Sequence, residues 1–261
     1  MHLVFAAHAD KAAPKAACRR LMKISEEAGF TCQLLSDELQ IPEGETAVIV
    51  AVGGDGNFIR TAHKACERNL PLFGVNCGHI GFLTEWTEDA FPEALNALES
   101  GSYIIRNVPM LSVYVNDTIQ RECFNDLRVY KQSFSGVARI SLEIDGESVG
   151  ALNGDGVIVA TAIGSTGYSL SAGGPIVADG LDAMMITPIC AHTLHFRPVV
   201  ASADSVLTMK MEDGGVLASD GDRFCTVQSG DRITVTRSAQ TVQLLTFRKR
   251  NLFRLISEKL V

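Results

Sequence analysis

Hydrophobic and polar positions change their spacing partway along this chain. In the first hundred residues, short apolar runs alternate with stretches that have the 3.6-residue spacing of a helix packed on a core. The apolar runs cover residues 3–7, 31–35, 47–52 and 71–75, and the helical stretches cover residues 14–28, 57–68 and 90–98. Strands that alternate with helices predict a parallel sheet covered by helices.

Beyond about residue 105, one short alternating strand follows another. These strands are expected at residues 111–115, 123–130, 139–144, 148–152, 206–211 and 233–236. The pattern predicts an α/β domain over residues 1–105 and a mainly β domain over residues 106–240. Residues 251–260 have an amphipathic helical pattern, so we expect the tail, residues 241–261, to pack back on a domain as a helix.

Composition narrows the possible partners and the compartment. The formal charge of -7 argues against nucleic acid or an acidic membrane as a bulk partner. No apolar run approaches the ~20 residues of a membrane helix and no signal peptide is visible, so we expect a cytoplasmic protein. The seven cysteines include no Cys-x2-Cys pair, which favours reduced thiols over disulfides or zinc ligands.

The first segment with candidate chemistry is Gly53-Gly54-Asp55-Gly56, which follows an apolar strand and precedes a helix. Glycines let a ligand approach the backbone closely, and amides at a helix start bind anions, so the pattern indicates a phosphate site. Phosphate repels Asp55 unless the carboxylate faces a metal ion, takes a proton or lies outside the charged cluster. A purely structural strand-to-helix turn is the alternative interpretation.

A second glycine-rich segment, residues 164–175, follows the apolar strand at residues 156–160. Ser165 or Thr166 is expected to cap a short helix, and Tyr168 offers an aromatic face on which a base can stack. A structural loop is again the alternative, because glycine and serine are common in sharp turns. One glycine-rich element in each domain suggests a small-molecule site between the domains.

The order of these motifs resembles the signature of the NAD kinases. The resemblance is carried by Gly53-Gly54-Asp55-Gly56, Asn125-Asp126, Asp155 and residues 164–175, with further similar segments at residues 78–83, 189–192 and 219–221. It implies the NAD kinase/diacylglycerol kinase-like fold, with residues 1–105 as a phosphate-binding domain and residues 106–240 as a dinucleotide-binding domain. It also implies transfer of the γ-phosphoryl group of ATP to the 2′-hydroxyl of the adenosine ribose of NAD, giving NADP and ADP, with a divalent metal ion, Mg²⁺. The family further implies a homo-oligomer, either a dimer or a tetramer.

The resemblance also assigns roles to individual residues. Asp55 would be the catalytic residue, accepting or orienting the hydroxyl proton. The residues expected to bind the ATP phosphates are Gly53, Gly54, Gly56 and Asn57. The residues expected to bind NAD are Asp55, Gly56, Phe82, Asn125, Asp126, Asp155, Thr166, Gly167, Tyr168 and Ser171. No protein side chain is assigned to the metal.

Several residues depart from the family pattern. Asp126 is one methylene shorter than the family's glutamate, and Ile163 and Gly167 replace threonine and alanine. These departures motivate a second hypothesis, a dinucleotide-binding regulator without catalysis. A third is a lipid or sugar kinase of the same superfamily, because Gly-Gly-Asp-Gly alone is not specific to NAD kinases.

Overall fold

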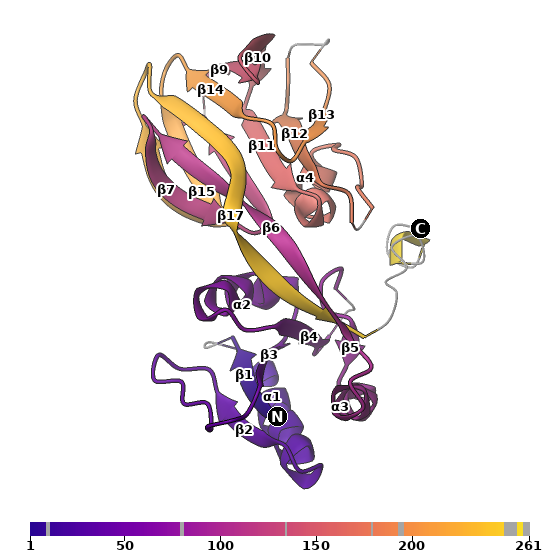
Figure 1. The fold of residues 1–261 in the computed structure, drawn as a ribbon. Coiled ribbons are helices and arrows are strands. Elements are labelled where there is room, and N and C mark those ends of the chain that lie inside the picture. Colours follow the sequence, from indigo (N-terminus) through magenta and orange to yellow (C-terminus); the bar gives the residue numbers. More distant parts are fainter. Residues whose placement is uncertain are drawn as a thin grey trace. The chain divides into compact units, whose positions relative to one another are not determined.

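A computed structural model describes residues 1–8, 11–78, 81–133, 135–178, 180–192, 196–247 and 255–257. The chain divides into two compact units (Figure 1). Unit 1 contains Met1–Val108 and Thr241–Val261, and unit 2 contains Pro109–Gln240. Each unit is described below by itself.

Unit 1 alternates strands with helices. Its elements are β1 (His2–Ala7), α1 (Ala12–Glu27), β2 (Thr31–Leu34), β3 (Ala47–Val52), α2 (Asp55–Arg68), β4 (Leu72–Asn76), β5 (Trp86–Thr87) and α3 (Phe91–Glu99). The strands β4, β3, β1 and β2 lie side by side in that order and are parallel. No helix among the described residues is both long and apolar enough to cross a membrane.

The parallel sheet of unit 1 is buried on both faces. Phe5 and Val50 lie on one face in a cluster with Leu21 of α1 and Phe91 of α3. On the other face, Phe58 of α2 packs so closely on β4 that a side chain at Gly74 would collide with it. Burial on both faces explains why these strands are continuous apolar runs rather than alternating ones.

Unit 2 consists mainly of antiparallel strands. Its elements are β7 (Thr118–Cys123), β8 (Asp126–Tyr130), β9 (Ala138–Ile144), β10 (Glu147–Gly154), β11 (Gly156–Thr161), the 3₁₀ turn η1 (Ile163–Thr166), α4 (Tyr168–Ser171), β12 (Ala183–Ile189), β13 (Val199–Ser202), β14 (Leu207–Met211), β15 (Gly215–Ser219) and β16 (Asp222–Val227). Two long strands, β6 (Ile104–Val115) and β17 (Arg232–Thr246), carry the chain from one unit to the other.

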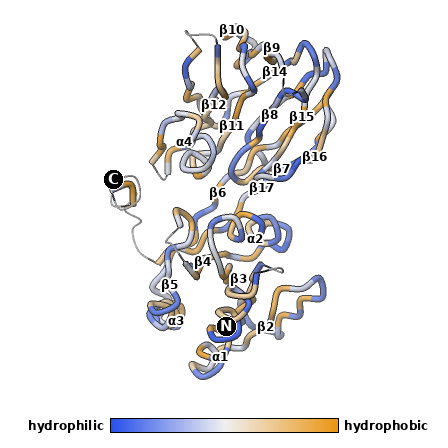
Figure 2. Tube along the Cα trace, turned by 180° about the vertical axis from the view of Figure 1, so that it is seen from behind, coloured by the Kyte–Doolittle hydropathy of each residue, from blue (hydrophilic) through white to orange (hydrophobic). Residues whose placement is uncertain are grey.

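The core of unit 2 lies between two sheets. One contains β10, β9, β14 and β17, and the other runs β13, β12, β11, β8, β15 and β16. Leu142 and Met209 from the first sheet share one cluster with Val129 and Val157 from the second. Figure 2 shows hydrophobic residues along the strands of this unit. The result is a packed β sandwich, so the predicted combination of a parallel α/β part and a mainly β part is confirmed.

Some predicted elements differ from those in the structure. The single strand expected at residues 123–130 is two strands, interrupted at Phe124 and Asn125, whose amides bond to Asp220 instead of a neighbouring strand. Residues 241–246 extend β17 rather than starting a helical tail. The helix expected over residues 251–260 falls outside the described residues except for residues 255–257, which are helical.

The sandwich core generates a prediction about stability. Leu142 is fully buried in β9, so Leu142→Ala should lower the free energy of unfolding by about 2–5 kcal/mol through lost burial and a residual cavity. Ile119 in β7 is 53% exposed, and Ile119→Ala should change it by less than about 0.5 kcal/mol. Urea unfolding of both variants measures the difference. Equal losses would contradict the placement of Leu142.

Candidate functional site

The glycine-rich turn of unit 1 joins β3 to α2. Gly53 adopts φ +140°, a conformation that residues with a side chain rarely take. The helix begins immediately afterwards at Asp55, earlier than predicted, and no side chain caps it. Instead, the Asn57 side-chain amide donates to the carbonyl oxygens of Ala6 and Val52, at 3.0 and 3.1 Å. Asn57 therefore ties the ends of β1 and β3 together, while its own backbone amide donates to the Gly54 carbonyl oxygen at 3.0 Å.

The carboxylate of Asp55 holds the loop that follows β4. Its Oδ2 accepts from the Phe82 amide at 2.7 Å, and its Oδ1 accepts from the Leu83 amide at 3.1 Å. A side chain at Gly81 would lie 1.8 Å from Oδ1, so only glycine fits there. The structure thus brings two predicted residues, Asp55 and Phe82, together in unit 1. His79 and Ile80, in the family-like segment 78–83, lie outside the described residues.

Two polar residues that were not predicted complete this network. The Thr84 hydroxyl lies 3.5 Å from Asp55 Oδ1 and accepts from the Asn76 side-chain amide at 2.8 Å. Both residues are buried, and Asn76 is the last residue of β4. Asn76 could have been predicted from the sequence, because it is a polar residue at the end of an apolar strand. Ligand sites in α/β folds lie at the carboxyl ends of strands.

In unit 2, Asp220 organises the start of β8. Its carboxylate accepts from three consecutive backbone amides, those of Phe124, Asn125 and Asp126, at 2.7–3.1 Å. Sequence reasoning placed Asp220 only within a family-like segment and gave it no role. Its carboxylate fixes the backbone of the predicted pair Asn125-Asp126 at the end of a strand, which is the location that lets neighbouring side chains serve one site.

Asn125 carries an acceptor without a partner. Its Oδ1 is buried and, among the described residues, receives no hydrogen bond. Its amide nitrogen lies close to Gly167, where an added side chain would come within 3.2 Å of it. Buried acceptors are normally satisfied, and an unsatisfied one points to a ligand or water. Asn125 and Gly167, both predicted as NAD-binding, are therefore neighbours.

Asp126 is fully buried and paired with Arg128. The Arg128 Nε lies 2.6 Å from Asp126 Oδ1, and its guanidinium carbon lies 4.7 Å from the ring centroid of Tyr168. Both residues are on one face of β8, because side chains two positions apart on a strand share a face. Burial raises the pKa of the Asp126 carboxyl, and the hydrogen bond and charge of Arg128 oppose that rise. Sequence reasoning missed Arg128, although its position two residues after Asp126 indicates that both side chains share one face of a strand.

The prediction that Ser165 or Thr166 caps a short helix is wrong. The Ser165 hydroxyl accepts from the Val177 amide, and the Thr166 hydroxyl donates to the Ile163 carbonyl within the 3₁₀ turn. Helix α4 has Gly167 at its N-cap, and no side chain bonds there. Ser171, the last residue of α4, is exposed. The hydroxyls of this segment therefore stabilise the turn itself.

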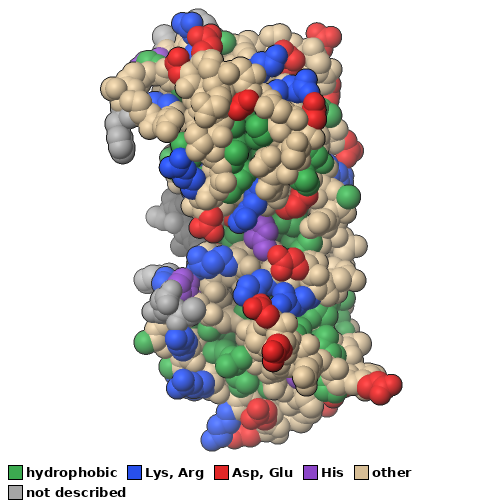
Figure 3. Space-filling model, turned by 90° about the vertical axis from the view of Figure 1, so that its left-hand side faces the viewer, with side chains coloured by type: hydrophobic (Ala, Val, Ile, Leu, Met, Phe, Trp, Pro, Cys, Tyr) green, Lys and Arg blue, Asp and Glu red, His purple; other side chains and the backbone are tan. Residues whose placement is uncertain are grey.

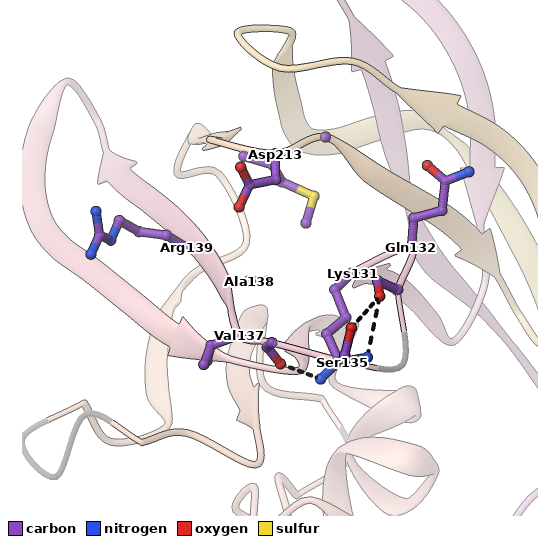
Figure 4. A pocket seen from close by; sticks show the side chains of 11 residues that line it. Lys131, Gln132, Ser135, Val137, Ala138, Arg139 and Asp213 are labelled. Atoms are coloured by element: carbon purple, nitrogen blue, oxygen red, sulfur yellow. Dashed lines mark hydrogen bonds between the residues drawn. The ribbon is translucent and has the colours of Figure 1, made fainter.

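Asp155 lies at the other end of β11 from Asn125. The strand places them about 20 Å apart, at about 3.3 Å per residue over six residues. The Lys131 ammonium lies 2.6 Å from the Asp155 carboxylate, and this contact lowers the pKa of Asp155. Lys131 also lines a pocket of about 480 Å³ with Arg139 and Asp213 (Figure 4). Unit 2 therefore does not gather all the predicted NAD-binding residues at one point.

Cys18, Cys32 and Cys77 have raised pKa values, and the described residues contain no cluster of metal ligands. Burial raises the pKa of Cys18 and Cys32 to about 11 and that of Cys77 to about 12, so these thiols stay protonated near neutral pH. No group of three or more His, Cys, Asp and Glu side chains in the described part of the chain is arranged to hold a metal ion.

Comparison with known proteins gives consistent matches along the whole chain. Residues 2–103 match the family described as ATP-NAD kinase N-terminal domain, and residues 124–247 match the ATP-NAD kinase C-terminal domain. The chain is 38% identical to the NAD kinase of Natranaerobius thermophilus over 225 residues, covering 83% of this chain and 79% of the relative. It is 35% identical to the NAD kinase of Geotalea daltonii over 238 residues, covering 88% and 84%.

Two solved structures share this fold. A crystal structure of an NAD kinase from Archaeoglobus fulgidus in complex with ATP matches with a TM-score of 0.77 and 26% identity, covering 99% of this chain and 98% of that one. Yeast NADH kinase complexed with NADH matches with a TM-score of 0.85 and 20% identity, covering 100% and 87%.

These matches establish the class as an ATP-dependent kinase with separate α/β and β parts. Within that class, the chain belongs to the NAD kinase family. The resemblance identified in the sequence is confirmed.

The buried ion pair of unit 2 gives a testable prediction. Arg128→Met would leave the Asp126 carboxylate buried without a partner, which should lower the free energy of unfolding by about 3–5 kcal/mol at pH 8. Without Arg128, the folded-state pKa of Asp126 rises further above its unfolded value. The loss should therefore shrink as pH falls through that raised pKa. Urea unfolding at pH 8 and pH 5.5 measures this change.

Two variants control this prediction. Adding Asp126→Asn to Arg128→Met removes the unpaired charge and should recover part of the loss. Arg121→Met removes an exposed arginine on β7 and should change stability by less than about 0.5 kcal/mol. A loss for Arg128→Met that did not depend on pH would show that packing, not the Asp126 charge, causes it.

Proposed function

We propose that this chain phosphorylates the 2′-hydroxyl of the adenosine ribose of NAD with the γ-phosphoryl group of ATP, and that Asp55 is its catalytic residue. Similarity to curated NAD kinases over both units supports this activity over the two alternatives. A lipid or sugar kinase has no need for the turn built by residues 164–175. A regulator without catalysis has no need for Asp55 at the phosphate-binding turn.

The observation that carries the proposal is the fixed position of the Asp55 carboxylate. It lies in the first turn of α2, where the helix dipole favours an anion. An ionised carboxylate offers about four acceptor positions. Donors among the described residues use two positions at Oδ1, for Leu83 and Thr84, and one at Oδ2, for Phe82. Oδ2 thus keeps a lone pair that can accept the proton of a ribose hydroxyl as it attacks phosphorus.

The backbone at the start of α2 is proposed to bind the transferred phosphates. The predicted residues Gly53, Gly54, Gly56 and Asn57 lie at or beside the first turn, where free N–H groups favour anions. The Gly53 amide donates to the Val75 carbonyl at 2.9 Å and the Asn57 amide to the Gly54 carbonyl at 3.0 Å, so the amides of Gly54 and Gly56 are the proposed phosphate donors. Mg²⁺ is usually bound through one or two carboxylates together with substrate phosphates, so the lack of a three-residue ligand cluster in the described chain fits this ion. Bound to the phosphates, Mg²⁺ would neutralise charge that develops during transfer.

In unit 2, the adenosine of NAD is proposed to bind at Asn125, Thr166, Gly167 and Tyr168. The unsatisfied Oδ1 of Asn125 would accept a hydrogen bond from the nucleoside, and the Tyr168 ring offers an apolar face. Asp126 contributes indirectly in this proposal, because Arg128 covers its carboxylate.

The other predicted contacts have less structural support. Phe82, Asp155 and Ser171 remain predicted NAD contacts, as family resemblance implies. The homo-oligomeric state and the cytoplasmic location also remain predictions.

The central test is Asp55→Asn. The amide retains the size of the carboxylate but cannot accept the ribose proton, so kcat should fall about 10²–10⁴-fold. Purified protein is incubated with ATP, Mg²⁺ and NAD, and NADP is measured with an NADP-specific dehydrogenase. In this variant an NH₂ group would replace one oxygen that accepts from a loop amide, and the loss of that hydrogen bond could destabilise the fold. A thermal melt must therefore show that the variant is folded under the assay conditions. A kcat close to that of the wild type would remove Asp55 from catalysis.

A matched control lies on the same helix. Glu67 is an exposed carboxylate that, among the described residues, pairs with its neighbour Arg68, so Glu67→Gln should leave kcat unchanged. If the wild type binds NAD but forms no NADP, the inactive regulator becomes the better hypothesis.

A further inference from the structure

Strand β8 presents a charged side chain on the face of its sheet that turns away from the sandwich core. Leu127 and Val129 belong to the core between the two sheets, so Arg128, which lies between them in sequence, is on the opposite face. On that face, Tyr168 of α4 packs in one cluster with Ile158 of β11, the cross-strand partner of Arg128. Arg128 therefore lies between the sheet and the segment proposed to bind adenosine.

The guanidinium group of Arg128 contacts two partners at once. Its Nε donates to Asp126 Oδ1 at 2.6 Å, and its Nη2 donates to Asp126 Oδ2 at 3.4 Å. Its central carbon lies 4.7 Å from the centroid of the Tyr168 ring. A cation within about 6 Å of an aromatic centroid is attracted by the electrons of the ring face. Arg128 therefore connects a buried carboxylate of the sheet to one face of the Tyr168 ring.

This connection differs from the charge pairs on the molecular surface. Figure 3 shows acidic and basic side chains intermingled on one face of the molecule, where water and salt weaken their attraction. The Asp126 side chain is 0% exposed and that of Arg128 is 24% exposed. Burial lowers the pKa of the Arg128 guanidinium, but the hydrogen bond and charge of Asp126 outweigh this effect and raise the pKa. Arg128 thus stays charged against the ring, with little screening by solvent.

The backbone that carries the Tyr168 ring is fixed independently of Arg128. The hydroxyl of Ser169, the next residue, lies 2.8 Å from the hydroxyl of Thr187 on β12, and both residues are buried. A side chain at Gly174 would come within 2.3 Å of the Ser169 hydroxyl, so the following turn also packs tightly on this bond. With the backbone held, the orientation of the Tyr168 ring depends on its own side-chain torsions. The contact with Arg128 restricts those torsions.

We propose that Arg128 is a positioning residue for nucleotide binding, which holds one face of the Tyr168 ring so that the other face is presented to the adenine of NAD. The inference rests on the adenosine site proposed above. A ring that is already oriented loses less side-chain freedom when the ligand binds, so the affinity for NAD increases. Asp126 has a part in this role, because its carboxylate fixes the guanidinium. Arg128 acts through Tyr168 and needs no contact with NAD.

The test uses a double variant that avoids an unpaired buried charge. Asp126→Asn with Arg128→Gln removes both charges and leaves two groups that can still form a hydrogen bond. Loss of the attraction between cation and ring should raise the KM for NAD about fivefold. The kcat at saturating NAD and the KM for ATP should stay within about twofold of the wild type, since the change affects only the binding of NAD. An unchanged KM for NAD would overturn the proposal.

The division between KM and kcat separates this role from a merely structural one. If the pair served only to stabilise the fold, the double variant would contain less folded enzyme. Its apparent kcat would then fall while its KM for NAD stayed at the wild-type value, which would contradict the proposal. A thermal melt shows whether the variant is folded at the assay temperature. Arg121→Gln removes an exposed arginine of β7 and is the matched control, for which the KM for NAD should not change.

A double-mutant cycle tests whether Arg128 acts through the ring. Tyr168→Leu removes the ring, and adding the double variant to it should raise the KM for NAD no further. Tyr168→Phe keeps the ring, so in that background the double variant should again raise the KM about fivefold. Equal increases with and without the ring would show that Arg128 acts by another route, and would overturn the proposal.

Binding must also be measured apart from turnover. Calorimetric titration of NAD should give about fivefold weaker binding to the double variant than to the wild type. If the wild type forms no NADP, the kinase activity is refuted, and the titration still decides the role of Arg128. Equal NAD affinity in the two proteins would refute that role even if NADP is formed.

Discussion

A carboxylate that accepts hydrogen bonds from consecutive backbone amides is the interaction on which both candidate sites depend. Asp55 accepts from Phe82 and Leu83 in unit 1, and Asp220 accepts from three amides beginning at Phe124 in unit 2. In each case these amides donate to a side-chain carboxylate rather than to a carbonyl group of a neighbouring strand. An unsatisfied buried amide is costly, so each carboxylate fixes its loop in one conformation.

The two carboxylates differ in what remains available to a ligand. Asp220 accepts from three backbone amides, and the side-chain oxygen of the neighbouring Asn125 receives no hydrogen bond from a described residue. Asp55 uses the same kind of bond but is held at a helix start, beside amides that favour phosphate. In unit 2 the bonds from backbone amides to Asp220 position the chain. In unit 1 the bonds to Asp55 position a loop and also hold the carboxylate for which we propose a catalytic role. These bonds to loop amides explain how the Asp55 carboxylate can be held in the turn for which we propose phosphate binding.

Charge at the sites is local and does not follow the net charge of the chain. Arg128 lies between the buried Asp126 carboxylate and the Tyr168 ring, and Lys131 covers Asp155. Arginine suits the first role, because its planar group can bond a carboxylate and stack on a ring at once. Lys15, Arg60 and Lys64 form another local group of positive charge in unit 1.

The sequence by itself determined the order of elements, the two fold classes and the two glycine-rich turns, since these follow from local periodicity and from glycines at strand ends. Only the tertiary structure decided which polar groups meet. The bond from Asp220 to Asn125 joins residues 95 positions apart, and that from Asp55 to Leu83 joins residues 28 apart. The capping role predicted for Ser165 or Thr166 was wrong for the same reason. A local pattern tells where a side chain can cap a helix, but the partner it finally bonds is set by strands that the fold brings alongside.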